Sequence, residues 1–137
     1  MTRLCLNMIV RNESAIIERC LASVAPYLAH WVILDTGSED DTPERIERFF
    51  AVAGVLGSLY RHPFTNFADS RNRALEAARA ADGDFDYLLL IDADMELVVE
   101  DPDCLRGLER SAYLVQQRSG ADQDGLAYDN VRLLRRD

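Results

Sequence analysis

Two aspartates one residue apart, Asp92 and Asp94, directly follow the apolar run of residues 87–91. A short apolar run bounded by polar residues predicts a strand that is buried on both faces. Because strand side chains alternate, we expect both carboxylates to project to one face and Ala93 to point away. Mg²⁺ and Mn²⁺ prefer oxygen ligands and usually bind one or two carboxylates together with substrate phosphates. The pair therefore predicts a metal site, and the alternative is an acidic turn after a core strand.

The sequence around this pair predicts an alternation of strands and helices that would position it. Further strands are expected at residues 4–10, 31–34 and 55–60, and helices are expected to begin near Asn12, Thr42 and Asn66. Helical spacing gives these helices buried faces, made of Ile16, Ile17, Cys20, Leu21 and Val24 in the first, Ile46, Phe49, Phe50 and Ala53 in the second, and Phe67, Ala68, Arg71, Ala74, Leu75 and Ala78 in the third. After Glu96 we expect only a short helix at 103–110 and two strands, 113–115 and 126–134, joined by a turn at 120–125.

This order of elements predicts an α/β fold with a mainly parallel central sheet and helices on both of its faces. In such sheets ligands bind at the carboxyl ends of the strands, near a switch in strand order. The polar loops at those ends are residues 11–13, 35–38 and 92–94. We therefore expect these three loops to form one site.

Composition restricts the class of protein. A chain of 137 residues with 48% hydrophobic and 28% charged residues predicts one globular domain. The net charge of −9 argues against a nucleic-acid surface, and the absence of lysine excludes a Walker-type or Schiff-base lysine. Three widely separated cysteines argue against a zinc site or a disulfide framework. With no signal peptide and no apolar run of about 20 residues, the sequence predicts a cytoplasmic protein without a transmembrane segment, and peripheral attachment to a membrane is left open.

Four blocks of the sequence, residues 7–13, 32–42, 64–75 and 88–96, together resemble the family 2 glycosyltransferases. The resemblance is to the bacterial branch whose first strand reads like Leu-Asn-Met-Ile-Val-Arg-Asn-Glu, and residues 131–136 resemble a later strand of that branch. It implies a GT-A (Rossmann-like) fold, a nucleotide-diphosphate sugar as donor and a bound Mn²⁺ or Mg²⁺. It also implies that residues 1–137 are a single domain, C-terminally truncated, that keeps the nucleotide-binding half and lacks most of the acceptor half.

The resemblance further implies roles for individual residues. The donor nucleotide would be bound by Val10, Arg11, Asn12, Glu13, Asp35, Arg71 and Asp92, and the metal by Asp94 and Asp92. Residues 10–13 would line a uridine pocket, Asp35 would accept hydrogen bonds from the base or ribose, and Arg71 would lie against the nucleotide. Asp92 would face the ribose and the metal, and Asp94 would hold the ion that bridges the two phosphates. Such a cation would neutralise the charge that develops on the departing diphosphate.

Simpler roles stand beside these assignments. Asp35 could begin an Asx turn, Arg71 could be a solvated helix residue, and Asn12 is expected to be a helix cap in either case. The four phenylalanines of the second and third helical segments fit a core better than a sugar-stacking platform; these are Phe49, Phe50, Phe64 and Phe67.

No catalytic residue is identified, because the resemblance places the general base of an inverting enzyme beyond Asp137. The acceptor, whether saccharide, lipid or protein, is not determined. The sequence leaves three origins open: a truncated chain, a fragmentary gene, or a short protein that completes its site as a homo-oligomer. The rival classes are a haloacid dehalogenase-type phosphotransferase, a nucleotidyltransferase and a nucleotide-sugar binding module without turnover. The first two rely on lysines that this chain lacks.

Overall fold

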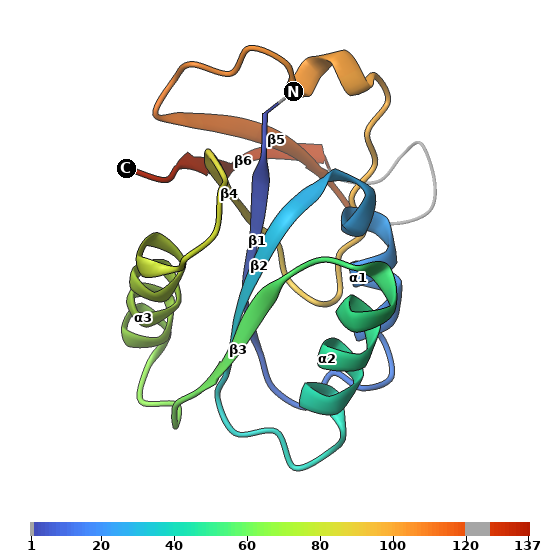
Figure 1. The fold of residues 1–137 in the computed structure, drawn as a ribbon, viewed down its shortest axis with the longest axis vertical. Helices are drawn as coiled ribbons and strands as arrows, with labels where there is room; N and C mark the ends of the chain where they lie inside the picture. The colour runs from blue at the N-terminus through green and yellow to red at the C-terminus, as the bar shows by residue number, and fades with distance from the viewer. Residues whose placement is uncertain (1, 120–126) are drawn as a thin grey trace.

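The computed structural model describes residues 2–119 and 127–137, which form one mixed sheet with helices on both faces (Figure 1). The described strands are β1 (Leu4–Val10), β2 (Leu28–Asp35), β3 (Gly57–Arg61), β4 (Tyr87–Leu90), β5 (Ala112–Arg118) and β6 (Ala127–Arg135). Their order in the sheet is β3-β2-β1-β4-β6-β5. The pairs among β1 to β4 are parallel, and β6 pairs antiparallel with both β4 and β5. The predicted α/β fold with a mainly parallel sheet is confirmed.

The order of the strands switches at β1. The strands β2 and β3 lie on one side of β1, and the chain then crosses over to place β4 on the other side. Strand pairing sets Val10 beside Asp35 and Asn7 beside Leu90. Ligands of open α/β sheets bind at such a switch, outside the carboxyl ends of the strands. The loops that follow β1, β2 and β4 therefore lie where a ligand is expected.

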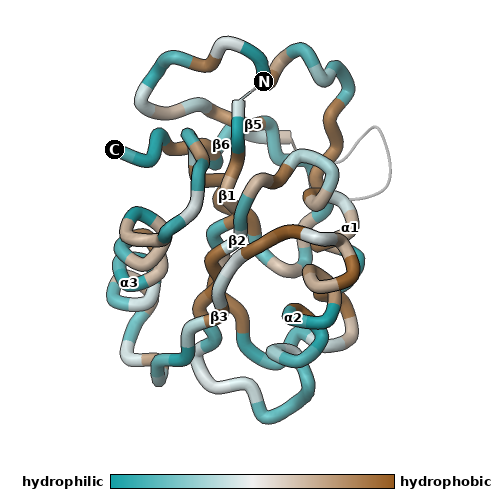
Figure 2. Tube along the Cα trace, viewed as in Figure 1, coloured by the Kyte–Doolittle hydropathy of each residue, from teal (hydrophilic) through white to brown (hydrophobic). Residues whose placement is uncertain are grey.

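Helices α1 (Ile17–Val24) and α2 (Thr42–Ala53) cover one face of the sheet, and α3 (Phe67–Ala80) covers the other (Figure 1). Alternate residues of β1 serve the two faces: Leu4, Leu6 and Met8 join the larger apolar cluster with α1 and α2, and Cys5 joins the smaller cluster with α3. Figure 2 shows the hydrophobic residues gathered along the central strands and hydrophilic residues in the loop that follows β2. Strands β1, β2 and β4 thus form the buried centre of the sheet, and β5 and β6 are its more exposed part.

Local chemistry explains where several elements begin and end. The Asn66 side chain caps α3 by accepting the N–H of Asp69 at 2.8 Å, as predicted. Helix α2 ends at Gly54, which takes the left-handed conformation (φ 74°) that a helix C-cap favours. At the start of β3, a Cβ on Gly57 would lie 2.2 Å from the backbone oxygen of Trp31, so only glycine fits there.

The predicted start of the first helix was wrong. Helix α1 begins at Ile17, and Asn12 is not its cap. The Asn12 backbone is left-handed (φ 53°), and its side chain accepts hydrogen bonds from the N–H groups of Glu39 and Asp40 instead. In α2 the cap is Asp41, and Thr42 is the first helical residue rather than the cap. The buried positions Ile17, Cys20, Leu21 and Val24 were predicted correctly.

The predicted core was too broad at three helix positions. Ala53, Phe67 and Ala68 are exposed, and none of the three belongs to an apolar cluster. Phe64 is also exposed and packs edge-to-face on Phe67 with ring centroids 5.2 Å apart. The short helix expected at 103–110 is a 3₁₀ turn, Pro102–Leu105. The turn expected at 120–125 lies outside the described residues.

Candidate functional site

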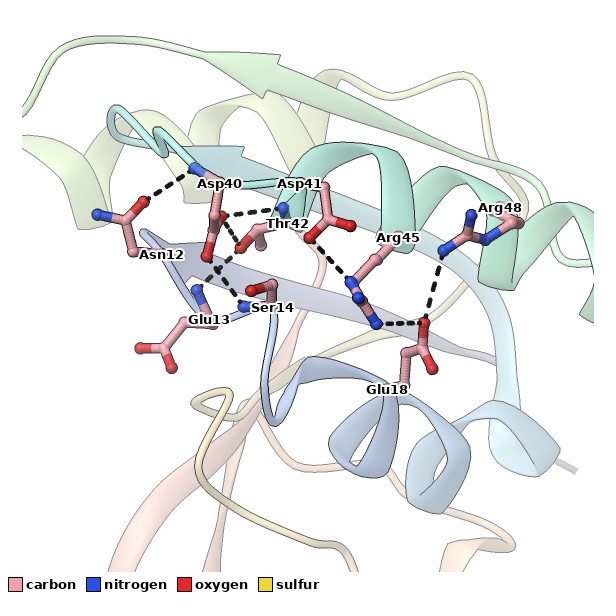
Figure 3. A network of polar contacts seen from close by, with 9 residues as sticks. All are labelled: Asn12, Glu13, Ser14, Glu18, Asp40, Asp41, Thr42, Arg45 and Arg48. Carbon is pink, nitrogen blue, oxygen red and sulfur yellow. Dashed lines mark hydrogen bonds and ion pairs between the residues drawn. The ribbon is translucent and has the colours of Figure 1, made fainter.

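The loops after β1 and β2 are joined by a network of hydrogen bonds, which we call the loop clamp; its residues are Asn12, Glu13, Ser14, Ser38, Glu39, Asp40 and Thr42. Of these, Figure 3 shows Asn12, Glu13, Ser14, Asp40 and Thr42. Asn12 accepts the N–H of Glu39 at 2.7 Å, and its own N–H donates to the Ser38 hydroxyl at 2.9 Å. The left-handed Asn12 backbone suits asparagine, which visits this conformation more readily than most residues. Each loop therefore holds the other in place.

Asp40 and Thr42 form the centre of the loop clamp. The Thr42 hydroxyl accepts the N–H of Glu13 at 2.9 Å and donates to Asp40 Oδ1 at 2.5 Å. The Asp40 carboxylate also accepts the N–H groups of Thr42 and Ser14. These bonds, the Thr42 hydroxyl first, lower the pKa of Asp40 from 3.8 to about 2. The clamp carboxylate thus stays ionised over the whole neutral and mildly acidic range.

Asp35 lies at the end of β2 with 2% of its surface exposed. Its Oδ1 accepts the N–H groups of Gly37 (2.9 Å) and Ser38 (2.8 Å), which is the Asx turn that the sequence left as an alternative. Its Oδ2 is buried and has no hydrogen-bond partner among the described residues. A buried acceptor of this kind usually finds a donor, so the Asx turn leaves one Asp35 oxygen for a ligand group.

The two aspartates after β4 lie in a turn and not on the strand. β4 ends at Leu90, and the N–H of Met95 donates to the carbonyl of Asp92 at 3.0 Å. The sequence predicted that alternation along a strand would orient these side chains, and this is not what orients them. Ala93 is nonetheless buried, whereas the Asp92 side chain is half-exposed and Asp94 is exposed. Both acids thus face away from the core.

Negative charge gathers where the clamp meets this turn. Burial raises the pKa of Glu13, and the charges of Asp94, Asp40 and Asp92 raise it further. Glu13 from the first loop is therefore close enough to both aspartates to feel their charge. Among the described residues no three His, Cys, Asp or Glu side chains gather as a ready metal cage. A cation bound here would depend on one or two carboxylates and on ligand oxygens.

Two arginines flank Asp92. Arg71 Nη2 lies 3.9 Å from Asp92 Oδ1, and Arg132 Nη1 lies 3.9 Å from Asp92 Oδ2. The buried Asn7 side chain donates to the carbonyls of Ala74 on α3 and Val32 on β2. These bonds fix α3, the helix that carries Arg71, against the sheet. Arg132, on β6, had no role in the sequence-based site, although it falls in the block 131–136 that carried the resemblance. Its position shows only once β6 pairs with β4.

The other predicted residues are placed less directly. The Val10 side chain is buried in the larger apolar cluster, and its carbonyl accepts the N–H of Thr36 at 3.0 Å. Arg11 is exposed and makes no side-chain hydrogen bond or ion pair with a described residue. A cavity of about 430 Å³ lies elsewhere, at the amino end of β4, where Phe85, Tyr87 and Leu108 help to line it. No helix within the described ranges is both long and apolar enough to cross a membrane.

Comparison with known proteins now gives the class. The fold is that of the GT-A glycosyltransferases, and TarS of S. aureus shares it. The crystal structure of TarS 1–349 in complex with UDP superimposes with a TM-score of 0.53 at 22% sequence identity, and the match covers 68% of this chain and 28% of that chain. The same form in complex with UDP-GlcNAc gives a TM-score of 0.55 at 19% identity, covering 68% and 27%. At such identities the likeness shows the fold alone.

The family follows from the sequence match. Residues 5–133 match the family described as Glycosyl transferase family 2, and the chain belongs to this family. A TPR repeat-containing protein of Synechococcus elongatus is 39% identical over 104 residues, which cover 73% of this chain and 22% of that protein. The chain therefore spans less than a third of the length of each of these matched proteins.

Proposed function

We propose that residues 1–137 form one domain that binds the donor of a glycosyltransferase. The reaction would move a sugar from a nucleotide-diphosphate sugar, with a UDP-sugar as first choice, to a saccharide, lipid or protein acceptor, with inversion. The observation that carries the proposal is the meeting of three polar loops at the switch between β1 and β4, in a chain of this family. TarS, which shares the fold, is described in complex with UDP and with UDP-GlcNAc.

The nucleoside would lie against the loop clamp. Residues 10–13 would line its pocket. Val10 would contribute through the shape of its backbone, and Arg11 through its exposed guanidinium. Asp35 Oδ2, which is buried without a partner among the described residues, would accept a hydrogen bond from the base or ribose. The clamp would hold Asn12 and Glu13 in place before the ligand arrives, which lowers the entropy cost of binding.

Mn²⁺ or Mg²⁺ would be held by Asp94, with Asp92 as the second carboxylate. The residues fit such an ion, because the Asp94 carboxylate is exposed and has no ion-pair partner in the described part of the chain. These cations bind through one or two carboxylates and fill their remaining positions with water and phosphate oxygens. When bound, the ion would supply charge neutralisation for the departing diphosphate.

A second candidate is a nucleotide-sugar binding module without turnover. It is favoured by the roles proposed for the site residues, all of which bind the donor or the metal and none of which is a catalytic base. Release of free sugar from UDP-GlcNAc, or transfer to an acceptor, by the 137-residue chain would decide against the module. Binding of the donor with no product after long incubation would favour it.

Calorimetric titration of UDP with and without Mn²⁺ tests the donor site itself. We expect Mn²⁺ to strengthen UDP binding in the wild type and Asp94→Ala to abolish that gain. Glu100→Ala is the matched control, because it removes one exposed acid from the same segment. If UDP, GDP and dTDP all fail to bind in the presence of Mn²⁺, the proposed function is wrong for this chain.

A further inference from the structure

Arg132 lies next to Asp92 but has no role in the donor and metal site proposed above. Its side chain is only 17% exposed, although it carries a full charge on a strand near the sheet edge. Its Nη2 donates to Gln117 Oε1 of β5 at 2.9 Å, which fixes the direction of the guanidinium. Its Nη1 faces Asp92, and its Nε is buried without an acceptor among the described residues.

Arg71 is arranged in the same way against the other carboxylate oxygen of Asp92. One nitrogen, Nη2, faces the carboxylate, and another, Nη1, is buried with no acceptor in the described ranges. Burial lowers the pKa of Arg71, Asp92 opposes this, and the nearby charge of Arg132 lowers the pKa further. Two cations thus share one carboxylate at 3.9 Å, a distance too long for a direct hydrogen bond.

We propose that Arg132 is a positioning residue for the diphosphate of the donor, and that with Arg71 it forms a two-guanidinium cradle next to Asp92. This inference rests on the proposed function. A diphosphate presents several anionic oxygens, and the planar fork of an arginine matches them with two parallel donors. It would satisfy the buried N–H groups that Asp92 leaves without a partner. The cradle also provides local positive charge in a chain whose net charge is −9.

A purely structural role for Arg132 is less consistent with the geometry. A guanidinium that served to join β6 to β4 would be expected to make a close ion pair, and here the contact with Asp92 is loose. The strands are already joined by their own backbone ladder and by the apolar Leu133. The hydrogen bond to Gln117 joins β6 to β5 through Nη2 alone, which leaves Nη1 facing Asp92 and Nε without an acceptor among the described residues.

The test compares Arg132→Gln with Arg118→Gln, each measured by calorimetry against UDP and against uridine in the presence of Mn²⁺. Arg118 lies on β5 and contacts Gln116, so its loss removes the same charge without touching Asp92. We expect Arg132→Gln to weaken UDP binding by about 10- to 100-fold, the effect of losing hydrogen bonds to a charged group. Uridine binding and the melting temperature should stay close to those of Arg118→Gln, and Arg132→Lys should recover part of the UDP affinity.

Each other outcome overturns the inference. Equal UDP affinity in Arg132→Gln and Arg118→Gln would show that Arg132 does not contact the diphosphate. A parallel loss of UDP affinity, uridine affinity and melting temperature would show a structural role. If the wild-type chain binds none of UDP, GDP and dTDP, the proposed function itself is wrong, and the cradle is wrong with it.

Discussion

The loop clamp and the surroundings of Asp92 lie at the same end of the sheet and differ in how well their polar groups are paired. In the clamp, the hydrogen bonds between the two loops run from 2.7 to 3.4 Å, and the central carboxylate accepts from three donors. Around Asp92, both guanidinium groups stay 3.9 Å from the carboxylate and keep a buried nitrogen without an acceptor among the described residues. The loop clamp is held by hydrogen bonds within the chain, whereas the two arginines next to Asp92 keep N–H donors that a ligand could use.

This difference follows from how the two regions are assembled. The clamp joins residues at the ends of two adjacent parallel strands, so a few turn residues are enough to link the two loops. The Asp92 region instead joins three separate elements, α3, the turn after β4, and β6. We infer that the nucleoside side of the site is preorganised, whereas the phosphate side depends on its ligand to satisfy its donors.

The largest effect is expected from Asp92→Asn, which removes the charge that both arginines share. Mn²⁺ affinity in the presence of UDP should fall by at least roughly 10- to 100-fold, since even outer partners of a metal ligand are worth that much. UDP affinity without metal should not fall, because the change removes a repulsion from the phosphates. Calorimetry with and without Mn²⁺ measures both. A metal-free loss as large as the metal-dependent one would contradict the distinction between the two regions.

Next in size is Thr42→Val in the loop clamp. The buried Thr42 hydroxyl pairs with the N–H of Glu13 and with Asp40, so its removal leaves buried groups unpaired. We expect the free energy of unfolding to fall by about 1–3 kcal/mol, measured by urea denaturation. Thr42→Ser keeps the hydroxyl and is the control. Wild-type stability in Thr42→Val would mean that the hydrogen bonds of the hydroxyl do not matter, and Thr42→Ser gives the separate cost of losing the methyl group.

Asn12 separates backbone strain from the hydrogen bonds of the clamp. Asn12→Gly removes the side-chain acceptor but suits the left-handed backbone, and we expect a loss of about 0.5–1.5 kcal/mol, the net contribution of a typical hydrogen bond. Asn12→Ala should lose roughly 1 kcal/mol more, because alanine tolerates this conformation poorly. Denaturation of the two variants side by side gives the difference. Identical stabilities would indicate that the Asn12 backbone rearranges.

The smallest effect concerns pH. Because hydrogen bonds lower the pKa of Asp40 to about 2, its contribution to stability is present above the ordinary value of 3.8 and is lost as the pH falls toward 2. Wild-type stability, followed by thermal unfolding between pH 5 and 2, should therefore fall more steeply than that of Asp40→Asn. Parallel curves for the two proteins would show that the carboxylate is not held by the clamp.

The sequence predicted the features that depend on neighbours along the chain. The bounds of β1, the Asn66 cap and the buried spacing of α1 all follow from local periodicity and side-chain type. It failed where a side chain has a distant partner. Asparagine is a residue type that often caps helices, yet the Asn12 side chain accepts the N–H of Glu39, 27 residues away in another loop.

Features set by the sheet as a whole were also out of reach of the sequence. The third helix begins beyond the apolar cluster, so Phe67 is 79% exposed despite its helical spacing. Arg132 joins Asp92 only through the pairing of β6 with β4, which no local pattern reveals. The predicted set of site residues still holds Asp35 and Arg71, whose buried atoms lack partners among the described residues.

The pairing of β6 with β4 also has a consequence for the time course of synthesis and folding. Strands β1 and β2 pair as soon as a short stretch of chain is available, so the nucleoside loops can come together early. Arg132 reaches its place only when β6 returns across the sheet, a long-range contact that forms slowly. A nascent chain would therefore acquire its nucleoside side before its phosphate side. We expect it to become competent for the full donor only after β6 has paired with β4.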